Sequence, residues 1–276
     1  MEFVYADLLK GLNIKKGDII DVASDMASII IYARNKKEEF NIDKLIDVLK
    51  ESVGEEGTLM IRTFNWDFCH GTDFDIRTSP SRTGMLGAAA LKRSDFKRTA
   101  HPIYSWMVWG KHTDELCAMS NISAFGEGSP FEFLYAHYGK QICLGNSNTD
   151  ACTQLHNAEF VAGAPYRFDK PFTANYTDME GNTAEATYRM PVRPLDVEVQ
   201  ADEFFDGERY DFLESKGIIA KTFPFEDLRC LVIDLRKLQD FVVDDIKNNA
   251  GINMVAVNGQ RGYLAAGIDY SKARYF

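Results

Sequence analysis

The chain of 276 residues is 45% apolar and 26% charged, and its 31 basic and 41 acidic side chains give a formal net charge of −10. This composition predicts a globular protein with a continuous core and argues against binding to nucleic acid or an anionic membrane. No apolar run reaches the length of a membrane helix and no signal-peptide pattern begins the chain, so we expect a cytoplasmic protein. Five cysteines without a C-x-x-C pair, together with five scattered histidines, argue against a disulfide framework and against a metal site.

Strands and helices alternate in the first half of the chain. Apolar spacing and turn residues predict, in chain order, a helix over 3–12, a strand over 18–22, helices over 26–34 and 42–52, a strand over 57–61, a helix over 84–93 and a strand over 103–108. The segment 62–83 reads as one long irregular loop. Loops of this length inside compact domains are usually functional.

The second half continues the alternation and then changes character. We expect helices over 130–137, 153–160, 212–216 and 235–247, strands over 141–144 and 230–233, an antiparallel β region over about 164–200 with a turn at 178–182, and a C-terminal strand pair at 254–257 and 263–266. The pattern predicts one domain over 1–276, with a layered α/β/α fold, a central mixed sheet and a β-rich insertion at about 164–200.

His156 and Glu159 are three residues apart in the predicted helix 153–160 and therefore project from one face of it. The helix follows a strand end, where ligands collect in open α/β sheets. A carboxylate that orients an imidazole makes it a general base near neutral pH. The alternative is that both side chains only decorate a helix surface, and for an isolated H-x-x-E this is the better interpretation.

Five motifs together resemble one family. The motifs are G-T-L-M-I-R-T-F at 57–64, F-D-I-R-T-S-P-S-R-T-G-M-L at 74–86, H-P-I-Y-S at 101–105, G-E-G-S-P-F at 126–131 and L-H-N-A-E at 155–159. Their order and spacing resemble those of the aminoglycoside 3-N-acetyltransferase family. The resemblance covers roughly residues 1–200. It implies acetyl-CoA as cosubstrate, no metal, direct transfer to an amine on a sugar, and an α/β/α fold that differs from the GNAT fold.

The donor site is expected at two helix entries. Backbone N–H groups of Ser24, Asp25 and Met26 are candidates to stabilise the thioester oxygen, although the family's turn looks like H-S-S-L and this chain has A-S-D-M. Thr63, which follows a strand, is a candidate contact to the thioester, with a structural role as the alternative. A second group of residues suits the phosphates and pantetheine of CoA: Arg77, Ser79, Ser81, Arg82 and Thr83. The alternative is that these residues only cap the next helix.

The resemblance implies a small-molecule amine as acceptor. Candidate contacts to it are Asp67, Asp73, Glu127, Arg167 and Arg193. The alternative for Glu127 is capping or turn formation, and the two arginines could bind an anionic part of the acceptor or pair with surface acids. The loop 65–73 and the segment 164–168 look more like relatives associated with surface-polysaccharide biosynthesis, which slightly favours a biosynthetic or nucleotide-linked amino sugar, with an aminoglycoside antibiotic as the alternative. From other classes, the His–Glu pair could serve a CoA-thioester or amide hydrolase, and the altered turn at 23–26 could leave a noncatalytic CoA-binding protein. A homodimer is compatible with the sequence.

Overall fold

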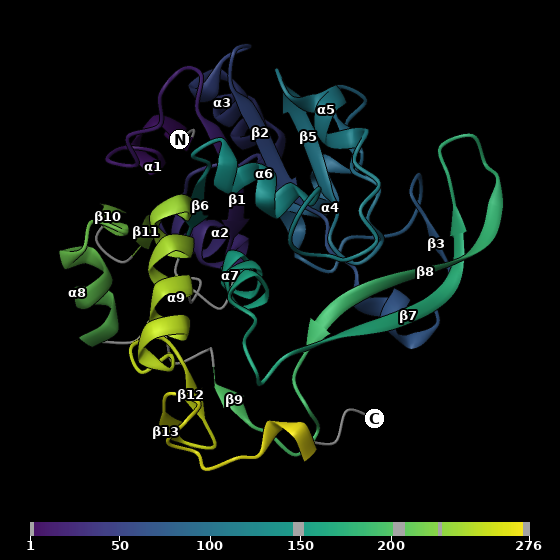
Figure 1. The fold of residues 1–276 in the computed structure, drawn as a ribbon. Helices are drawn as coiled ribbons and strands as arrows, with labels where there is room; N and C mark the ends of the chain where they lie inside the picture. The colour runs from purple at the N-terminus through teal and green to yellow at the C-terminus, as the bar shows by residue number, and fades with distance from the viewer. Residues whose placement is uncertain (1–2, 146–151, 201–207, 226–227, 273–276) are drawn as a thin grey trace.

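The computed structural model describes residues 3–145, 152–200, 208–225 and 228–272. Its centre is a seven-stranded mixed sheet (Figure 1). From one edge to the other, the strands are β10 (Ile219–Phe225), β11 (Leu228–Asp234), β6 (Lys140–Leu144), β1 (Ile19–Ser24), β2 (Thr58–Arg62), β5 (Trp106–Gly110) and β4 (Lys97–Arg98). The three central strands β6, β1 and β2 are parallel, whereas β11 and β5 run antiparallel to them. The carboxyl ends of β6, β1 and β2 therefore meet at one edge.

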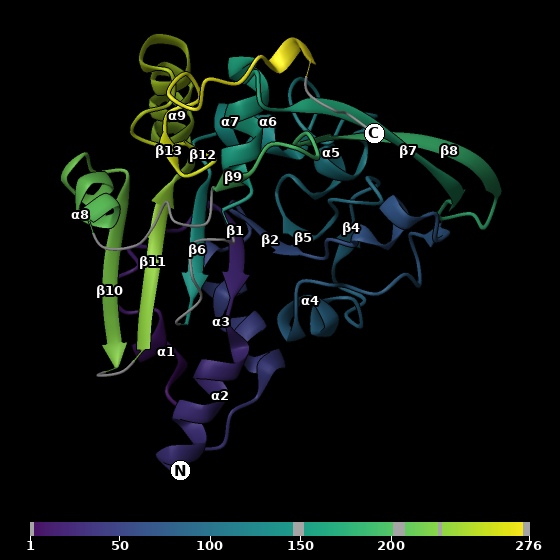
Figure 2. The ribbon, with the colours of Figure 1, turned by 90° about the horizontal axis from the view of Figure 1, so that it is seen from below.

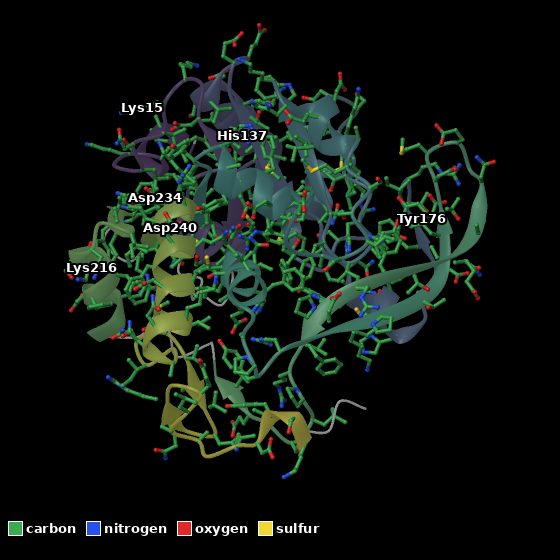
Figure 3. All side chains as sticks on the ribbon, viewed as in Figure 1. Lys15, His137, Tyr176, Lys216, Asp234 and Asp240 are labelled. Carbon is green, nitrogen blue, oxygen red and sulfur yellow. The ribbon has the colours of Figure 1, made fainter. Side chains whose placement is uncertain are left out.

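Helices cover both faces of the sheet (Figure 2). On one face lie α2 (Met26–Asn35), α3 (Ile42–Val53) and α4 (Met85–Ala90), and on the other lie α6 (Pro130–Ala136), α7 (Gln154–Ala162) and α9 (Leu235–Asn249). Side chains start these helices as their sequences lead one to expect: Asp25 caps α2, Asn41 caps α3, and Asp234 caps α9 by accepting from the Lys237 N–H at 3.0 Å (Figure 3). The predicted α/β/α layers are confirmed.

A buried polar group lies on the sheet face that α6, α7 and α9 cover. The Arg62 guanidinium, on β2, donates to the Asp21 carboxylate of β1, with both Nε···O distances 3.0 Å, and to the Gln141 side chain of β6 at 2.7 Å. The Trp106 indole N–H also donates to Asp21, at 2.9 Å. The Asp21–Arg62 ion pair and its hydrogen bonds thus link the three central strands and their neighbour β5 beneath the helices.

The predicted β region is a long antiparallel hairpin of β7 (Phe168–Thr177) and β8 (Thr183–Val192). It projects from the body of the protein (Figure 1), and β3 (Phe74–Asp75) extends it by pairing with the end of β7. Between β2 and β3 the chain forms a short 3-10 helix, η1 (Trp66–His70), that packs against β7. The long loop 62–83 thus supports the hairpin through η1 and β3.

Several predicted boundaries are wrong. The first helix, α1, is only Tyr5–Leu8, α4 ends at Ala90, and β5 begins at Trp106 because the residues before it turn around His101. Residues 263–266 are not a strand: β12 (Ala256–Val257) pairs with β13 (Gln260–Arg261) and with β9 (Val199–Gln200). The predicted helix 212–216 is the end of α8 (Glu208–Ser215). Short β4, α5 (Thr113–Cys117), β10 and η4 (Tyr270–Lys272) lack a periodic signal and were not predicted.

Within the described ranges, no helix is long and apolar enough to cross a membrane. The same part of the chain contains no group of three or more His, Cys, Asp or Glu side chains placed to hold a metal ion. The interpretation of the hairpin as an insertion in a single domain stays a prediction.

Candidate active site

The candidate site lies where the parallel strands end. Ser24 of β1 pairs with Leu144 of β6, and the Asp25 N–H donates to the Leu144 carbonyl at 2.8 Å. Soon after β6 the chain enters α7, which packs closely on α9 (Figure 1). The sheet thus carries His156, in the first turn of α7, to the edge where ligands gather in such folds.

The pair predicted from the helix spacing is formed. His156 Nδ1 lies 2.8 Å from Glu159 Oε2. Glu159 is buried with 5% of its side chain exposed, whereas His156 is 34% exposed. Because a carboxylate only accepts hydrogen bonds, a neutral imidazole that donates to Glu159 has its proton on Nδ1 and its lone pair on Nε2. The imidazole is oriented as a base, with its outer nitrogen available.

Arg167 completes this pair and does not stand free to bind an anionic acceptor. Its Nε lies 3.0 Å from Glu159 Oε2, and its side chain is 13% exposed. Burial alone would raise the pKa of Glu159, but the Arg167 charge and the His156 contact outweigh it and lower that pKa to about 2. A cavity of about 310 Å³ adjoins Glu159 and Arg167 at the base of the hairpin.

Aromatic side chains pack beside the His156–Glu159 pair. The Phe125 ring lies 6.2 Å from the His156 ring and 5.3 Å from Tyr104, which in turn packs on Phe64. Phe64 is buried, whereas Trp66 at the start of η1 is 38% exposed. The long loop therefore provides an apolar lining near the base and one partly exposed aromatic ring.

The first predicted donor turn lies at the strand ends, but its groups are partly engaged. The Asp25 N–H is used by Leu144, and the Asp25 carboxylate accepts from the Ser28 N–H at 3.2 Å. The Met26 N–H, at the N-terminus of α2, remains the candidate of this turn for a thioester oxygen. Thr63 is fully buried, and its hydroxyl lies 3.0 Å from the Ser105 hydroxyl, so the structure supports a structural role for it.

The second donor segment folds back over the end of β2. The Thr83 hydroxyl donates to the Arg62 carbonyl at 2.7 Å and lies 2.9 Å from the Ser81 hydroxyl. Neither caps α4, whose N-cap is Gly84 with φ 92°. The Arg82 N–H donates to the Phe64 carbonyl, and its guanidinium pairs with Asp67 at 2.6 Å on the surface. An exposed pair of this kind contributes little to stability.

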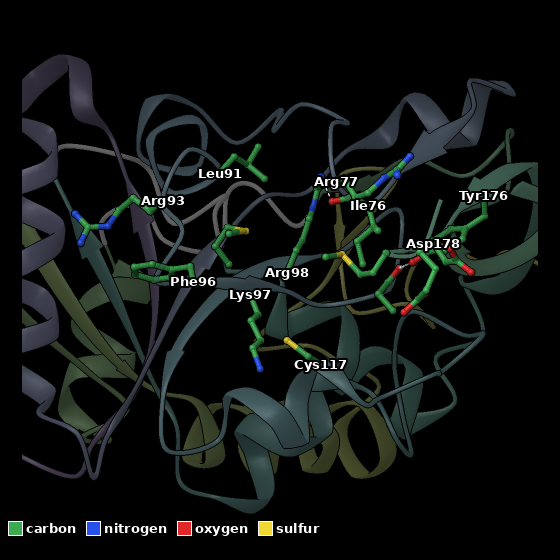
Figure 4. Close-up of a pocket in the computed structure, with 14 residues that line it drawn as sticks. Ile76, Arg77, Leu91, Arg93, Phe96, Lys97, Arg98, Cys117, Tyr176 and Asp178 are labelled. Atoms are coloured by element: carbon green, nitrogen blue, oxygen red, sulfur yellow. Dashed lines mark hydrogen bonds between the residues drawn. The ribbon is translucent and has the colours of Figure 1, made fainter. Parts of the chain in front are cut away.

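Arg77 and Ser79 are held elsewhere. Arg77 pairs with Asp75 at 2.8 Å and lines a cavity of about 430 Å³ between the hairpin tip and β4 (Figure 4). The Ser79 hydroxyl accepts from the Asp75 N–H at 2.9 Å. The buried Arg98 guanidinium holds this stretch by donating to the Ser79 carbonyl at 2.6 Å. The structure thus separates Arg77 from the segment 81–83.

The remaining predicted acceptor residues lie apart from one another. Asp73 accepts from the Asn175 N–H at 3.1 Å and so ties the loop to the hairpin, and Asp67 is the partner of Arg82. Arg193 donates to the Val197 carbonyl at 2.7 Å beyond β8. Glu127 is exposed on the turn before α6, where the Gly126 N–H donates to Asn157 of α7 at 2.8 Å. Of the five, Arg167 alone contacts the His156–Glu159 pair.

One supporting network was missed from the sequence. The Gln239 side-chain oxygen, on α9, accepts from Gln154 at 2.6 Å and from Asn157 at 2.7 Å. All three side chains are buried. They fix α7 against α9 and, through Asn157, against the turn that carries Glu127. A periodicity argument treats such amides as surface residues, and only their burial identifies them.

His101 is a structural histidine. It is buried, its Nδ1 accepts from the Ile103 and Tyr104 N–H groups at 3.3 and 3.2 Å, and burial lowers its pKa to about 3 from an ordinary 6.5. Because the unfolded chain then binds the proton more readily, stability falls as pH drops below 6.5, by about 1.4 kcal/mol per pH unit. Glu159 adds to the loss below its ordinary pKa of 4.5.

We therefore expect urea unfolding to show a lower free energy at about pH 5 than at about pH 7. His101→Asn keeps an acceptor for the two N–H groups but cannot take a proton, so its decrease over this interval should be smaller. An equal decrease in the variant and the wild type would contradict the assignment of this pH dependence to His101.

A histidine–carboxylate pair at the strand ends of a layered α/β/α sheet is typical of enzymes that use acid–base chemistry. The chain belongs to the aminoglycoside 3-N-acetyltransferase family, whose sequence model matches residues 24–247. It is an acyltransferase that uses acetyl-CoA. The family predicted from the five motifs is thereby confirmed.

Curated relatives agree with this assignment. The chain is 26% identical over 263 residues to aminoglycoside N(3)-acetyltransferase III of Serratia marcescens, and the alignment covers 88% of each protein. It is 30% identical over 175 residues to the SPbeta prophage-derived aminoglycoside N(3')-acetyltransferase-like protein YokD of Bacillus subtilis (strain 168), covering 55% of this chain and 62% of that one.

Solved structures show the same fold. AAC-IIIb in its binary complex with CoASH superposes with a TM-score of 0.72 at 20% identity, covering 90% of this chain and 98% of the other. Aminoglycoside acetyltransferase AAC(3)-Xa superposes with a TM-score of 0.70 at 23% identity, covering 89% and 93%.

Proposed function

We propose that this enzyme transfers the acetyl group of acetyl-CoA to an amine of an aminoglycoside, with His156 as general base. The observation that carries the proposal is the contact of 2.8 Å between His156 Nδ1 and the buried Glu159 carboxylate, which leaves Nε2 able to accept a proton. Glu159 orients the imidazole and offsets the positive charge that it gains.

In the proposed reaction, His156 accounts for the proton that the amine loses and the thiolate gains. An amine attacks the thioester carbonyl, and His156 Nε2 accepts the N–H proton as the C–N bond forms. The Met26 N–H, at the start of α2, is the candidate donor for the oxygen that becomes negative. When the C–S bond breaks, His156 returns the proton to the leaving thiolate. The imidazole is then neutral again.

Charge and relatives support an aminoglycoside over the biosynthetic amino sugar that the resemblance of the loops 65–73 and 164–168 slightly favoured. Aminoglycosides carry several ammonium groups, and the chain has a net charge of −10. The Serratia marcescens relative is named for aminoglycoside N(3)-acetylation. A nucleotide-linked sugar would need free cations near the base, whereas Arg167 is paired with Glu159 and Arg193 holds the Val197 carbonyl.

Thiol release from acetyl-CoA tests the proposal across aminoglycosides, free amino sugars and nucleotide-linked amino sugars, with mass spectrometry of the products. We expect thiol release coupled to the mass gain of one acetyl group on an aminoglycoside. Acetylation of the other sugars alone would contradict the acceptor. Thiol release without any acetylated product would indicate a hydrolase, and CoA binding without turnover would indicate a noncatalytic protein.

The donor site gives a separate prediction. Arg82→Ala removes the cation of the segment 81–83, so we expect weaker binding of CoA, which calorimetry measures. Arg77→Ala is the matched variant: the same residue change in the same loop, but at the cavity under the hairpin tip. Equal CoA affinity in Arg82→Ala and the wild type would remove Arg82 from the donor site, and a loss confined to Arg77→Ala would move the site to the hairpin.

A further inference from the structure

Arg167 returns to the catalytic helix through a tight turn. Helix α7 ends at Gly163, which has the left-handed φ of 69° that favours glycine, and the Ala164 N–H donates back to the Glu159 carbonyl at 3.0 Å. The Arg167 N–H then donates to the Ala164 carbonyl at 3.1 Å. The chain therefore folds back and places Arg167, eight residues after Glu159, against the side of α7.

The Arg167 guanidinium donates to both oxygens of the Glu159 carboxylate. Nε lies 3.0 Å from Glu159 Oε2, the oxygen that His156 also contacts, and Nη2 lies 3.3 Å from Oε1. Nη2 is also 3.4 Å from His156 Nδ1. Two donors in a fixed fork restrict rotation of the carboxylate more than a single ammonium would. The three side chains form one contiguous unit, of which only the imidazole is substantially exposed.

Arg167 also supplies the charge that a buried carboxylate needs. A guanidinium stays protonated at every relevant pH. Among the described residues, the other titratable side chains near the unit include Tyr104, Tyr166 and, across the adjoining cavity, Asp169, which pairs with Arg189. Burial raises the pKa of both tyrosines, for Tyr104 to about 12. The Tyr166 hydroxyl makes no hydrogen bond with any residue that the structure describes. Neither tyrosine can replace the cation.

We propose that Arg167 is a positioning residue for the transfer reaction, holding Glu159 fixed and ionised so that His156 stays neutral with its proton on Nδ1. This inference rests on the proposed base function of His156. Without Arg167, the buried carboxylate is neutralised most easily by a proton on the adjoining imidazole, and a protonated imidazole cannot accept another. The carboxylate is also free to rotate away from Nδ1.

Kinetics of Arg167→Gln and Arg167→Lys test the proposal. We expect Arg167→Gln to lower kcat by about 10- to 100-fold, as for contacts that support a metal ligand from behind. The KM for acetyl-CoA should stay unchanged, and the acid limb of the pH profile should move to higher pH. Arg167→Lys keeps a charge without the fork, so it should retain more activity. Lys111→Ala, which removes a cation from an exposed pair with Glu56, should behave as wild type.

Two further measurements separate positioning from folding. Millimolar guanidinium should partly restore kcat in Arg167→Ala, because the adjoining cavity of about 310 Å³ can admit the ion, and should not affect Lys111→Ala. In a His156→Ala background, loss of Arg167 should cause no additional decrease in kcat, because residues that act as one unit are non-additive. An additive loss, or a changed KM for the acceptor with normal kcat, would overturn the proposal in favour of direct acceptor binding.

Nitrogen NMR of histidine-labelled protein reads the same contact without any acceptor. The wild type should show the Nδ1–H tautomer for His156, assigned by its absence in His156→Ala, and Arg167→Gln should show a protonated or mixed imidazole. An unchanged tautomer in Arg167→Gln would overturn the inference even if the transfer reaction is confirmed. If His156→Ala instead keeps full activity, the proposed base has failed, and the NMR result still decides what Arg167 does to the imidazole.

Discussion

Replacing His156 by alanine is expected to reduce kcat by roughly two to four powers of ten, the contribution of a positioned general base. The affinity for CoA should stay close to wild type, because the imidazole lies on α7 while the donor segment 81–83 lies at the end of β2. Steady-state kinetics and calorimetry on the same preparation measure both quantities. Unchanged turnover in His156→Ala would contradict the base assignment.

The chain offers a closely matched control. His112 Nδ1 lies 2.8 Å from Glu115, also three residues further on, so it makes the same contact at the same distance as His156, but with an exposed glutamate. His112 follows β5, whose last residue Gly110 pairs with Thr58 at the start of β2, and so it lies at the opposite edge of the sheet. We expect His112→Ala to keep wild-type kcat.

The largest expected effect on stability comes from Arg62→Met. The change leaves the Asp21 carboxylate buried without its cation and should lower the free energy of unfolding by about 3–5 kcal/mol. Because domains are stable by only about 5–15 kcal/mol, this is a large fraction of the total. Urea unfolding followed by circular dichroism measures the loss.

The double variant Asp21→Leu/Arg62→Met distinguishes a stability loss caused by the unpaired charge from a loss caused by altered packing. Replacing both members by apolar side chains removes the unpaired charge, so we expect most of the lost stability to return. Lys111→Ala, which removes an exposed partner of Glu56, should leave the urea midpoint unchanged. A double variant as unstable as Arg62→Met would show that packing, and not the uncompensated charge, dominates.

The sequence predicted features that depend on neighbouring residues. A spacing of three in a helix is enough to bring His156 and Glu159 together, and apolar periodicity located β1, β2, β6, α3 and α9 within a few residues. The five motifs identified the family because they are local and ordered along the chain. Short elements such as β4, α5 and β13 have too few residues for a periodic pattern, and they form because the surrounding structure holds them.

Partner choice between distant residues was decided only by the tertiary structure. From the sequence, Arg167 could contact an anionic part of the acceptor or pair with a surface acid, and the turn after α7 brings it to the buried Glu159. Arg77 and Arg82 read as one phosphate site, yet Asp75 and Asp67 hold them at different places. Likewise, H-x-x-E occurs at 112–115 and at 156–159, and both form the same local contact. Sheet direction alone places the second pair at the carboxyl ends of the parallel strands, because a contact within one helical turn carries no information about which edge of the sheet it will occupy.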